Sequence, residues 1–391
     1  MRIGVDATCW ANGRGYGRFT RELVAAMAAI GPEHEFVCLL DARALARFDL
    51  AGSNVRPVVA GQRDSPTTAA SADGYRSPRD MLRLTRAIAR EPVDVFFSPS
   101  VYTYFPLPPR LPAVVTIHDA IAERYPHLTL PSARARLFWK LKVQLALWQA
   151  RMVLTVSEFA AAEIAEVHRI ARTRIRVAPE APAVAYSPSA SAADIDAQAR
   201  RVGLPAGSRW LTYVGGFSPH KNLDVLIRAH ARMARPLDNP PRLVLIGALR
   251  GDVFLGNLSA LRDVVRACGT EDLVLWPGYL PDEEIRHLHS GAIALVLPSE
   301  NEGFGLPAVE AAACGTPVIA TTGSPLPQLL GGGGVFVTPR DEDGLAAAIA
   351  RLAADPALAR ALGARARRRA SELSWSRGAR AALDALQEAA A

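Results

Sequence analysis

The chain has 391 residues, of which half are apolar and about a fifth charged, a composition typical of a soluble globular protein. One hydrophobic core rarely organises a chain of this length, so two domains are expected. No apolar run reaches the roughly 18 residues that a membrane-spanning helix needs. The four cysteines form neither a C-x-x-C pair nor a zinc pattern with histidine, which argues against a disulfide framework. The formal charge of +7 suits anionic ligands, without selecting among nucleotide diphosphates, lipid head groups and nucleic acid.

The first half of the chain alternates between strand-like and helix-like segments. Short apolar runs predict strands at residues 2–6, 35–40, 54–59, 94–98, 113–118 and 152–156. Since the first of these begins at residue 2, we expect no signal peptide and a cytoplasmic location. Residues 60–78 are polar and small, without an apolar period, and indicate either a binding loop or disorder.

A segment rich in Pro, Ala and Ser, residues 178–193, predicts a hinge, and a second alternation follows it. Strands are expected at residues 209–214, 242–247, 273–276, 292–297, 317–321 and 334–337, before arginine-bearing helices that begin near Asp341. Strands that alternate with helices favour parallel sheets covered by helices. The predicted fold class is therefore α/β, with two successive halves.

The loop after the first strand carries Gly13, Gly15 and Gly17 at alternate positions and then opens a helix. Glycines allow the backbone to approach a ligand closely, although a tight turn is an equally simple explanation. The spacing does not match the G-x-G-x-x-G dinucleotide fingerprint, so it implies no dehydrogenase.

Residues 132–152 predict a helix that is both cationic and aromatic. Leu137, Leu141, Leu145 and Trp148 form one stripe along it, which we expect to face the core. The alternative, that this helix rests on an anionic membrane, stays open.

Two glycines, Gly215 and Gly216, end a predicted strand, and Lys221 stands where the next helix is expected to start. A compact positive charge beside free backbone N–H groups is suited to a diphosphate. A solvated lysine is the alternative. Lys221 is the only lysine after residue 142, in a chain that otherwise uses arginine.

Residues 298–318 follow an apolar run at 292–297 that predicts a strand, and they combine a glycine-rich turn with a short Ala-rich helix that contains Pro307 near its start. In doubly wound folds, phosphate and ribose groups bind where a strand leads into a helix N-terminus. Seven residues separate Glu302 in the turn from Glu310 in the helix, so the two carboxylates can meet different parts of one ligand. Considered without the surrounding motif, the alternative interpretation is that both glutamates are solvated surface residues.

The run from Glu302 through Pro307, with Gly315-Thr316-Pro317-Val318 after it, resembles the signature of glycosyltransferase family 4. Other segments resemble further parts of this family: the N-terminal glycine loop, His118-Asp119, the Lys221 loop, Gly278-Tyr279 and the Trp375 region. One departure is Phe217, where the commonest family form has an arginine. The second cation for a diphosphate is then expected from His220 or Arg18.

The resemblance implies a GT-B fold, in which two Rossmann-like doubly wound domains face an interdomain cleft. The expected parts are an acceptor domain (1–185), a donor domain (200–372) and a terminal helix (373–391) that returns to the first domain. It implies His118, Glu302 and Lys221 as catalytic residues. The donor-binding residues that it implies are Gly15, Gly17, Arg18, Gly215, Gly216, His220, Lys221, Gly278, Tyr279, Glu302, Gly303, Phe304, Gly305, Leu306 and Glu310.

The resemblance implies a retaining transfer of a hexose. We expect the reaction to be metal-independent, because no H-E-x-x-H motif is present and Lys221 with helix N-termini can bind a diphosphate. GDP-mannose is the preferred donor, because Lys221-Asn222 and the run from Phe304 to Pro307 resemble the mannosyltransferase-like members of the family, and a UDP-hexose is the alternative. The expected acceptor is a glycan or a lipid-linked saccharide in polysaccharide or glycolipid assembly, with no cofactor and no nucleic-acid partner. A sugar-nucleotide epimerase and a catalytically silent nucleotide-sugar binding module remain rival hypotheses, as does peripheral contact with the cytoplasmic face of the inner membrane.

Overall fold

The computed structural model describes residues 1–62, 77–249 and 258–391. The chain forms two compact units, Met1–Glu180 together with Ser374–Ala391, and Ala181–Leu373. Most of the loop expected at residues 60–78 lies outside the described residues. No helix in the described ranges is both long and apolar enough to cross a membrane.

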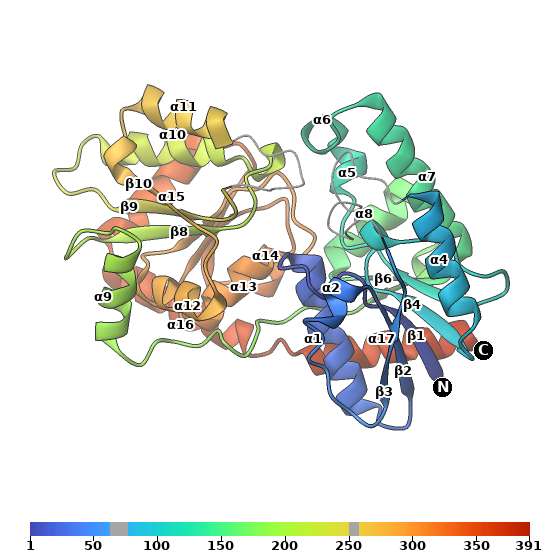
Figure 1. Ribbon diagram of the computed structural model, residues 1–391. Coiled ribbons are helices and arrows are strands. Elements are labelled where there is room, and N and C mark those ends of the chain that lie inside the picture. Colours follow the sequence, from blue (N-terminus) through green and yellow to red (C-terminus); the bar gives the residue numbers. More distant parts are fainter. Residues whose placement is uncertain (63–76, 250–257) are drawn as a thin grey trace. The chain divides into compact units, whose positions relative to one another are not determined.

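The first unit is built on a seven-stranded sheet whose neighbouring strands are all parallel. In spatial order the strands are β3 (Val55–Val59), β2 (Glu35–Leu40), β1 (Arg2–Asp6), β4 (Val95–Ser98), β5 (Ala113–Thr116), β6 (Ala150–Thr155) and β7 (Ile175–Val177). Its helices are α1 (Gly15–Ile30), α2 (Ala42–Leu45), α4 (Pro78–Ala89), α5 (Ile121–Arg124), α6 (Pro126–Thr129), α7 (Ala133–Gln149), α8 (Glu158–His168) and α17 (Trp375–Ala390), with 3-10 turns η1 (Val101–Thr103) and η2 (Arg172–Arg174). Helices lie on both faces of the sheet (Figure 1).

The second unit has a six-stranded sheet that is also entirely parallel. Its strand order is β10 (Val274–Gly278), β9 (Arg242–Ile246), β8 (Trp210–Val214), β11 (Leu295–Leu297), β12 (Val318–Thr321) and β13 (Gly334–Val337). The helices are α9 (Ala192–Arg201), α10 (Leu223–Ala234), α11 (Leu258–Cys268), α12 (Asp282–Gly291), α13 (Leu306–Ala313), α14 (Leu326–Leu329), α15 (Glu342–Ala354) and α16 (Pro356–Ala370), with 3-10 turns η3 (Pro219–Lys221) and η4 (Glu271–Leu273).

The strands form where the sequence offers short apolar runs, because the central strands of a parallel sheet are buried on both faces. Strands β4, β5, β11 and β12 are buried along their whole length. All the expected strands are present, with ends that differ by at most a few residues. Strand β7 was not predicted, since its three residues include an arginine in the middle and give no apolar run.

Serines fix where several helices begin. The side chains of Ser77, Ser132, Ser157, Ser191 and Ser374 each accept a hydrogen bond from a backbone N–H three residues later. This satisfies one of the N–H groups that a helix start leaves unpaired. Local sequence therefore determines these boundaries.

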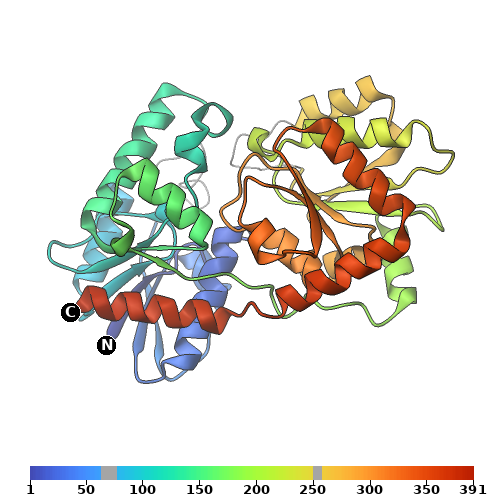
Figure 2. The same ribbon diagram turned by 180° about the vertical axis from the view of Figure 1, so that it is seen from behind.

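The terminal helix α17 belongs to the first unit, which confirms that the chain returns there after completing the second (Figure 2). It packs against α1 and strands β4 to β7, and its small residues Ala379, Ala382 and Ala385 are fully buried. At its end, Glu388 pairs with Arg176 of β7 at 2.6 Å.

Helix α7 corrects one expectation. Leu137, Leu141 and Trp148, which we expected to face the core, are 57%, 54% and 80% exposed. The buried residues are instead the small Ala135, Val143 and Ala146. Because α7 is apolar on opposite sides, its periodicity alone could not indicate which side packs against β5 and β6.

Candidate functional site

The second sheet has a topological switch point between β8 and β11. From β8 the chain continues to β9 on one side, and from β11 it continues to β12 on the other. In open parallel sheets the crevice at the carboxyl ends of two such strands is where ligands bind. The loops that leave β8 and β11 at this point carry Lys221 and Glu302.

These two loops are joined by a set of hydrogen bonds. The backbone N–H of Glu300 donates to the carbonyl of His220 at 2.8 Å. The amide Nδ2 of Asn222 donates to the carbonyl of Pro298 at 3.3 Å and to Glu300 Oε2 at 3.0 Å. The loop conformation is therefore determined jointly by residues far apart in sequence.

Lys221 and Glu302 form an ion pair in which Lys221 Nζ lies 2.7 Å from Glu302 Oε1. The hydroxyl of Ser299 donates to the same carboxylate oxygen at 2.6 Å. The two charged side chains are only 19% and 12% exposed, so water and salt screen this pair less than a surface pair. Lys221 ends the 3-10 turn η3, and α10 begins two residues later, so Lys221 precedes the helix that we expected it to start.

The turn before α13 requires glycine at Gly305. Its φ is +86°, and a Cβ there would lie 2.9 Å from a methyl group of Leu326. No side chain caps the N-terminus of α13, whose second residue is Pro307. Glu310 lies in the next turn of the helix and is 4% exposed. Gly303, Phe304 and Leu306 are all buried.

The packing at the end of β8 explains why residue 217 is phenylalanine, where the commonest form of the family has an arginine. This ring is buried and packs against the rings of Tyr213 and Trp276, at centroid distances of 6.4 and 5.6 Å. The Tyr213 hydroxyl donates to the carbonyl of Gly216 at 2.5 Å, and a Cβ on Gly247 would lie 2.1 Å from the carbonyl oxygen of Gly215. The glycines thus permit close packing of neighbouring strand ends, and Phe217 belongs to the core.

His220 contributes a neutral imidazole. Burial and the adjacent charge of Lys221 lower its pKa to about 3. Its Nδ1 atom is buried and has no hydrogen-bond partner among the described residues. Near neutral pH the imidazole is therefore uncharged and supplies no second positive charge.

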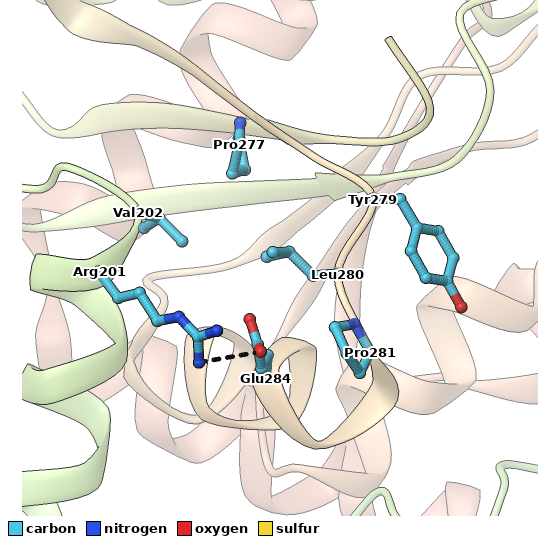
Figure 3. Close-up of a pocket in the computed structure, with 7 residues that line it drawn as sticks. All are labelled: Arg201, Val202, Pro277, Tyr279, Leu280, Pro281 and Glu284. Carbon is cyan, nitrogen blue, oxygen red and sulfur yellow. Dashed lines mark ion pairs between the residues drawn. The ribbon is translucent and has the colours of Figure 1, made fainter. Parts of the chain in front are cut away.

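The loop after β10 lines a pocket of about 490 Å³ (Figure 3). Gly278 ends the strand with φ +86°, and Tyr279 is 69% exposed. Arg201 at the end of α9 pairs across the pocket with Glu284 of α12 at 3.0 Å. Figure 3 shows the Tyr279 ring standing apart from the other lining side chains, so its faces are accessible.

The first sheet has its own switch point, between β1 and β4. Helix α1 begins at Gly15, and a Cβ on Gly17 would lie 2.2 Å from the carbonyl oxygen of Asn12. Arg21, in the second turn of α1, donates to the carbonyls of Trp10 and Asn12 at 2.6 and 2.7 Å. These contacts hold the glycine loop against the helix. Arg18 is half-buried on the same helix.

His118 follows β5 at the carboxyl edge of the first sheet. Its Nε2 lies 3.1 Å from the carbonyl oxygen of Pro99, and because a carbonyl only accepts, Nε2 carries the proton. The ring meets Phe19 edge to face at 4.7 Å. Burial lowers the pKa of His118 to about 4, so the imidazole is neutral and Nδ1 is an acceptor.

The structure therefore places the predicted residues of the second unit at the ends of β8, β10 and β11 or in the segments that follow them, and those of the first unit after β1 and β5. Sequence reasoning missed Asn222, Ser299 and Arg21, which position these loops. For Asn222 a signal existed, since asparagine tolerates the positive φ of +50° found there, just before α10. Among the described residues, no group of three or more His, Cys, Asp or Glu side chains is arranged to hold a metal ion.

Two family models match the chain. The model "Glycosyl transferases group 1" covers residues 194–369, which include Lys221, Glu302 and Glu310. The model "Glycosyltransferase Family 4" covers residues 13–181, which include His118 and the loop with Gly15 and Gly17.

Curated relatives and solved structures agree with these matches. The O-antigen chain mannosyltransferase B of Escherichia coli is 31% identical over 283 residues, which are 72% of this chain and 71% of that protein. A D-inositol 3-phosphate glycosyltransferase of Thermobispora bispora is 38% identical over 45% of this chain and 42% of its own length. The fold is also that of the sucrose-phosphate synthase of Thermosynechococcus elongatus, with a TM-score of 0.75, 22% identity and coverage of 99% and 98% of the two chains.

The chain has two Rossmann-like units, each with a parallel sheet and a glycine-containing loop at the switch point of that sheet. This is the architecture of the GT-B class of glycosyltransferases. Within that class, the chain belongs to glycosyltransferase family 4.

Proposed function

We propose that this glycosyltransferase transfers a hexose from a nucleotide diphosphate to a glycan or a lipid-linked saccharide, with retention of anomeric configuration. In this proposal Glu310 binds the ribose hydroxyls, Lys221 neutralises the diphosphate, and Glu302 with the backbone of Gly303, Phe304 and Gly305 holds the sugar. The observation that carries the proposal is the largely buried Lys221–Glu302 ion pair at the switch point of the second sheet.

The ion pair gives these residues a preorganised starting position. An ammonium group has three N–H donors, so Lys221 can keep its bond to Glu302 and still donate to phosphate oxygens. As the sugar leaves, negative charge develops on the nucleotide diphosphate. Lys221 and the N-terminus of α13 would stabilise that charge, the electrostatic role that a metal ion fills in other enzymes.

The first unit carries residues whose chemistry suits a sugar and a phosphate. His118 is neutral, and its unprotonated Nδ1 can accept a hydrogen bond from a sugar hydroxyl. This supports a positioning contact and not attack as a nucleophile. Between the two candidates for a second cation, Arg18 is favoured over His220 because burial keeps the imidazole neutral. In this proposal the loop with Gly15 and Gly17 also belongs to the donor-binding residues.

For the donor we propose GDP-mannose, with Gly278 and Tyr279 at the base. Support comes from the relative named O-antigen chain mannosyltransferase B, which aligns over most of both chains. A second candidate is a UDP-hexose-dependent transferase of the same fold. An exposed tyrosine ring stacks on any base, so it does not favour guanine over uracil.

A turnover assay tests the proposal. The purified chain is incubated with GDP-mannose or UDP-glucose, a chelator and a glycolipid extract, and both nucleotide diphosphate release and labelled product are measured. We expect acceptor-dependent mannose transfer from GDP-mannose without metal, and none from the Glu302→Gln variant, which keeps the shape of the side chain but loses its charge. Transfer from UDP-glucose would show that the donor is a UDP-hexose and not GDP-mannose. Conversion of the donor without an acceptor would indicate an epimerase. Binding of the donor without turnover would indicate a silent binding module.

A further inference from the structure

One side of α7 presents large apolar side chains to solvent. We call this the α7 face, made of Leu137, Phe138, Leu141, Leu145 and Trp148. Four of these are between 45% and 80% exposed, and Leu145 is half-buried. The spacing of three and four residues puts them on one side of the helix. Single exposed apolar residues are ordinary, but a contiguous apolar patch on a soluble protein marks an interaction surface.

The charges on α7 are all of one sign. Arg134, Arg136 and Lys140 are exposed, and the helix contains no Asp or Glu between residues 133 and 149. The Arg134 guanidinium lies 5.4 Å from the centre of the Phe138 ring. Arg136 and Lys140 are four residues apart, so they neighbour each other along one edge of the face.

The opposite side of the helix is firmly attached to the first unit. The indole N–H of Trp139 donates to Glu123 Oε1 at 2.8 Å. Lys142 donates to the carbonyl of Tyr102 at 3.3 Å and lies over the Trp139 ring. These contacts attach α7 to the first unit on the side opposite the α7 face.

We propose that the α7 face binds the surface of an anionic lipid bilayer. Leucine and aromatic side chains insert at the boundary of head groups and acyl chains, while arginine and lysine extend toward the phosphates. A helix with this composition and no acidic residue complements a negatively charged surface. The biological role of this binding rests on the proposed function, since a lipid-linked acceptor lies at such a surface. The binding to lipid itself does not depend on the nucleotide-sugar donor.

Co-sedimentation with vesicles tests this inference. The full chain is mixed with vesicles of phosphatidylcholine alone or of phosphatidylcholine with phosphatidylglycerol, and bound protein is measured at low and high salt. Two double variants are compared, Leu141→Ser with Trp148→Ser and Arg136→Gln with Lys140→Gln. The matched control is Leu237→Ser, because Leu237 is an exposed leucine (41%) in the second unit. Melting temperatures establish that each variant is folded.

We expect the wild-type protein to bind only the vesicles that contain phosphatidylglycerol. The variant Leu141→Ser with Trp148→Ser, called the apolar variant, should lose this binding, and Leu237→Ser should retain it. In the Arg136→Gln, Lys140→Gln variant, each removed positive charge should weaken binding of the protein to the anionic vesicles about fivefold at low salt. Acrylamide quenching supplies a direct readout, since Trp148 should become protected when wild type meets anionic vesicles. Equal binding by wild type and the apolar variant, or no binding to anionic vesicles, would overturn the proposal. So would a wild-type dimer that the apolar variant dissociates, because the face would then bind a second copy. Release of nucleotide diphosphate with a soluble acceptor separates failure of membrane binding from failure of the proposed enzyme activity.

Discussion

At the residue scale, the site in the second unit depends on a charge pair formed by residues 81 positions apart. Lys221 in η3 and Glu302 after β11 meet because β8 and β11 are neighbours in the sheet. The sequence indicated each residue separately, from a Gly-Gly turn and from a glycine-rich loop. Their direct contact could not be predicted, since spacing along the chain carries no information on which loops are hydrogen-bonded to each other.

The Lys221→Ala variant should lower kcat/KM by about 100-fold or more, because a donor aimed at developing charge is lost from a partly buried site. Steady-state kinetics measure this. The matched control is Arg232→Ala, which breaks the exposed pair with Asp343 in the same unit and should leave kcat/KM unchanged. An unchanged kcat/KM in Lys221→Ala would remove this lysine from the diphosphate site.

At the scale of elements, the glycines at the two ends of α13 offer a matched comparison. Gly305 and Gly315 both have positive φ, +86° and +82°. A Cβ on Gly305 would lie 2.9 Å from Leu326, whereas one on Gly315 would meet nothing within 4 Å. Gly315→Ala should therefore cost only the backbone strain, about 1 kcal/mol, with donor affinity unchanged. Gly305→Ala should cost more stability and also weaken donor binding, because the turn that carries Glu302 must shift.

Denaturant unfolding and donor titration of both variants check this comparison. If Gly315→Ala weakened donor binding as much as Gly305→Ala, the effect would come from α13 as a whole and not from the turn before it.

The elements also show how far the sequence alone determines the fold. Apolar runs predicted the strands of both sheets, and serines mark several helix starts, because these signals are local. The signature from Glu302 to Pro307 likewise predicted the loop and helix that contain Glu310. In contrast, the outward side of α7, the core role of Phe217 and the positioning role of Asn222 depend on which elements pack together. Each of these is a tertiary property without a local pattern.

At the scale of the whole molecule, buried histidines link stability to pH in both units. Burial lowers the pKa of His118 to about 4 and of His220 and His289 to about 3. In the unfolded chain these groups have pKa values near 6.5 and take up protons first as the pH falls. The stability they support is therefore complete above about pH 6.5 and decreases as the pH falls toward about 4 and below.

We expect the free energy of unfolding to be lower at about pH 5 than at about pH 7, measured by denaturant titration. His289 is fully buried, with Nδ1 3.0 Å from the Thr212 hydroxyl, and a His289→Asn variant keeps a polar atom there but cannot titrate. Its loss of stability between the two pH values should be smaller than that of wild type. An identical loss in both proteins would show that the protonation of His289 is not linked to folding.

The measurement that tests the central claim most directly is a calorimetric titration of GDP-mannose into wild type and Glu310→Ala, in a chelator and without acceptor. The account predicts binding to wild type, and an affinity about 10-fold to 100-fold weaker in the variant, since a charged hydrogen-bond acceptor for the ribose is lost. An unaltered melting temperature would establish that the variant remains folded. Wild-type affinity in a folded Glu310→Ala variant would contradict the assignment of this loop and helix to the donor.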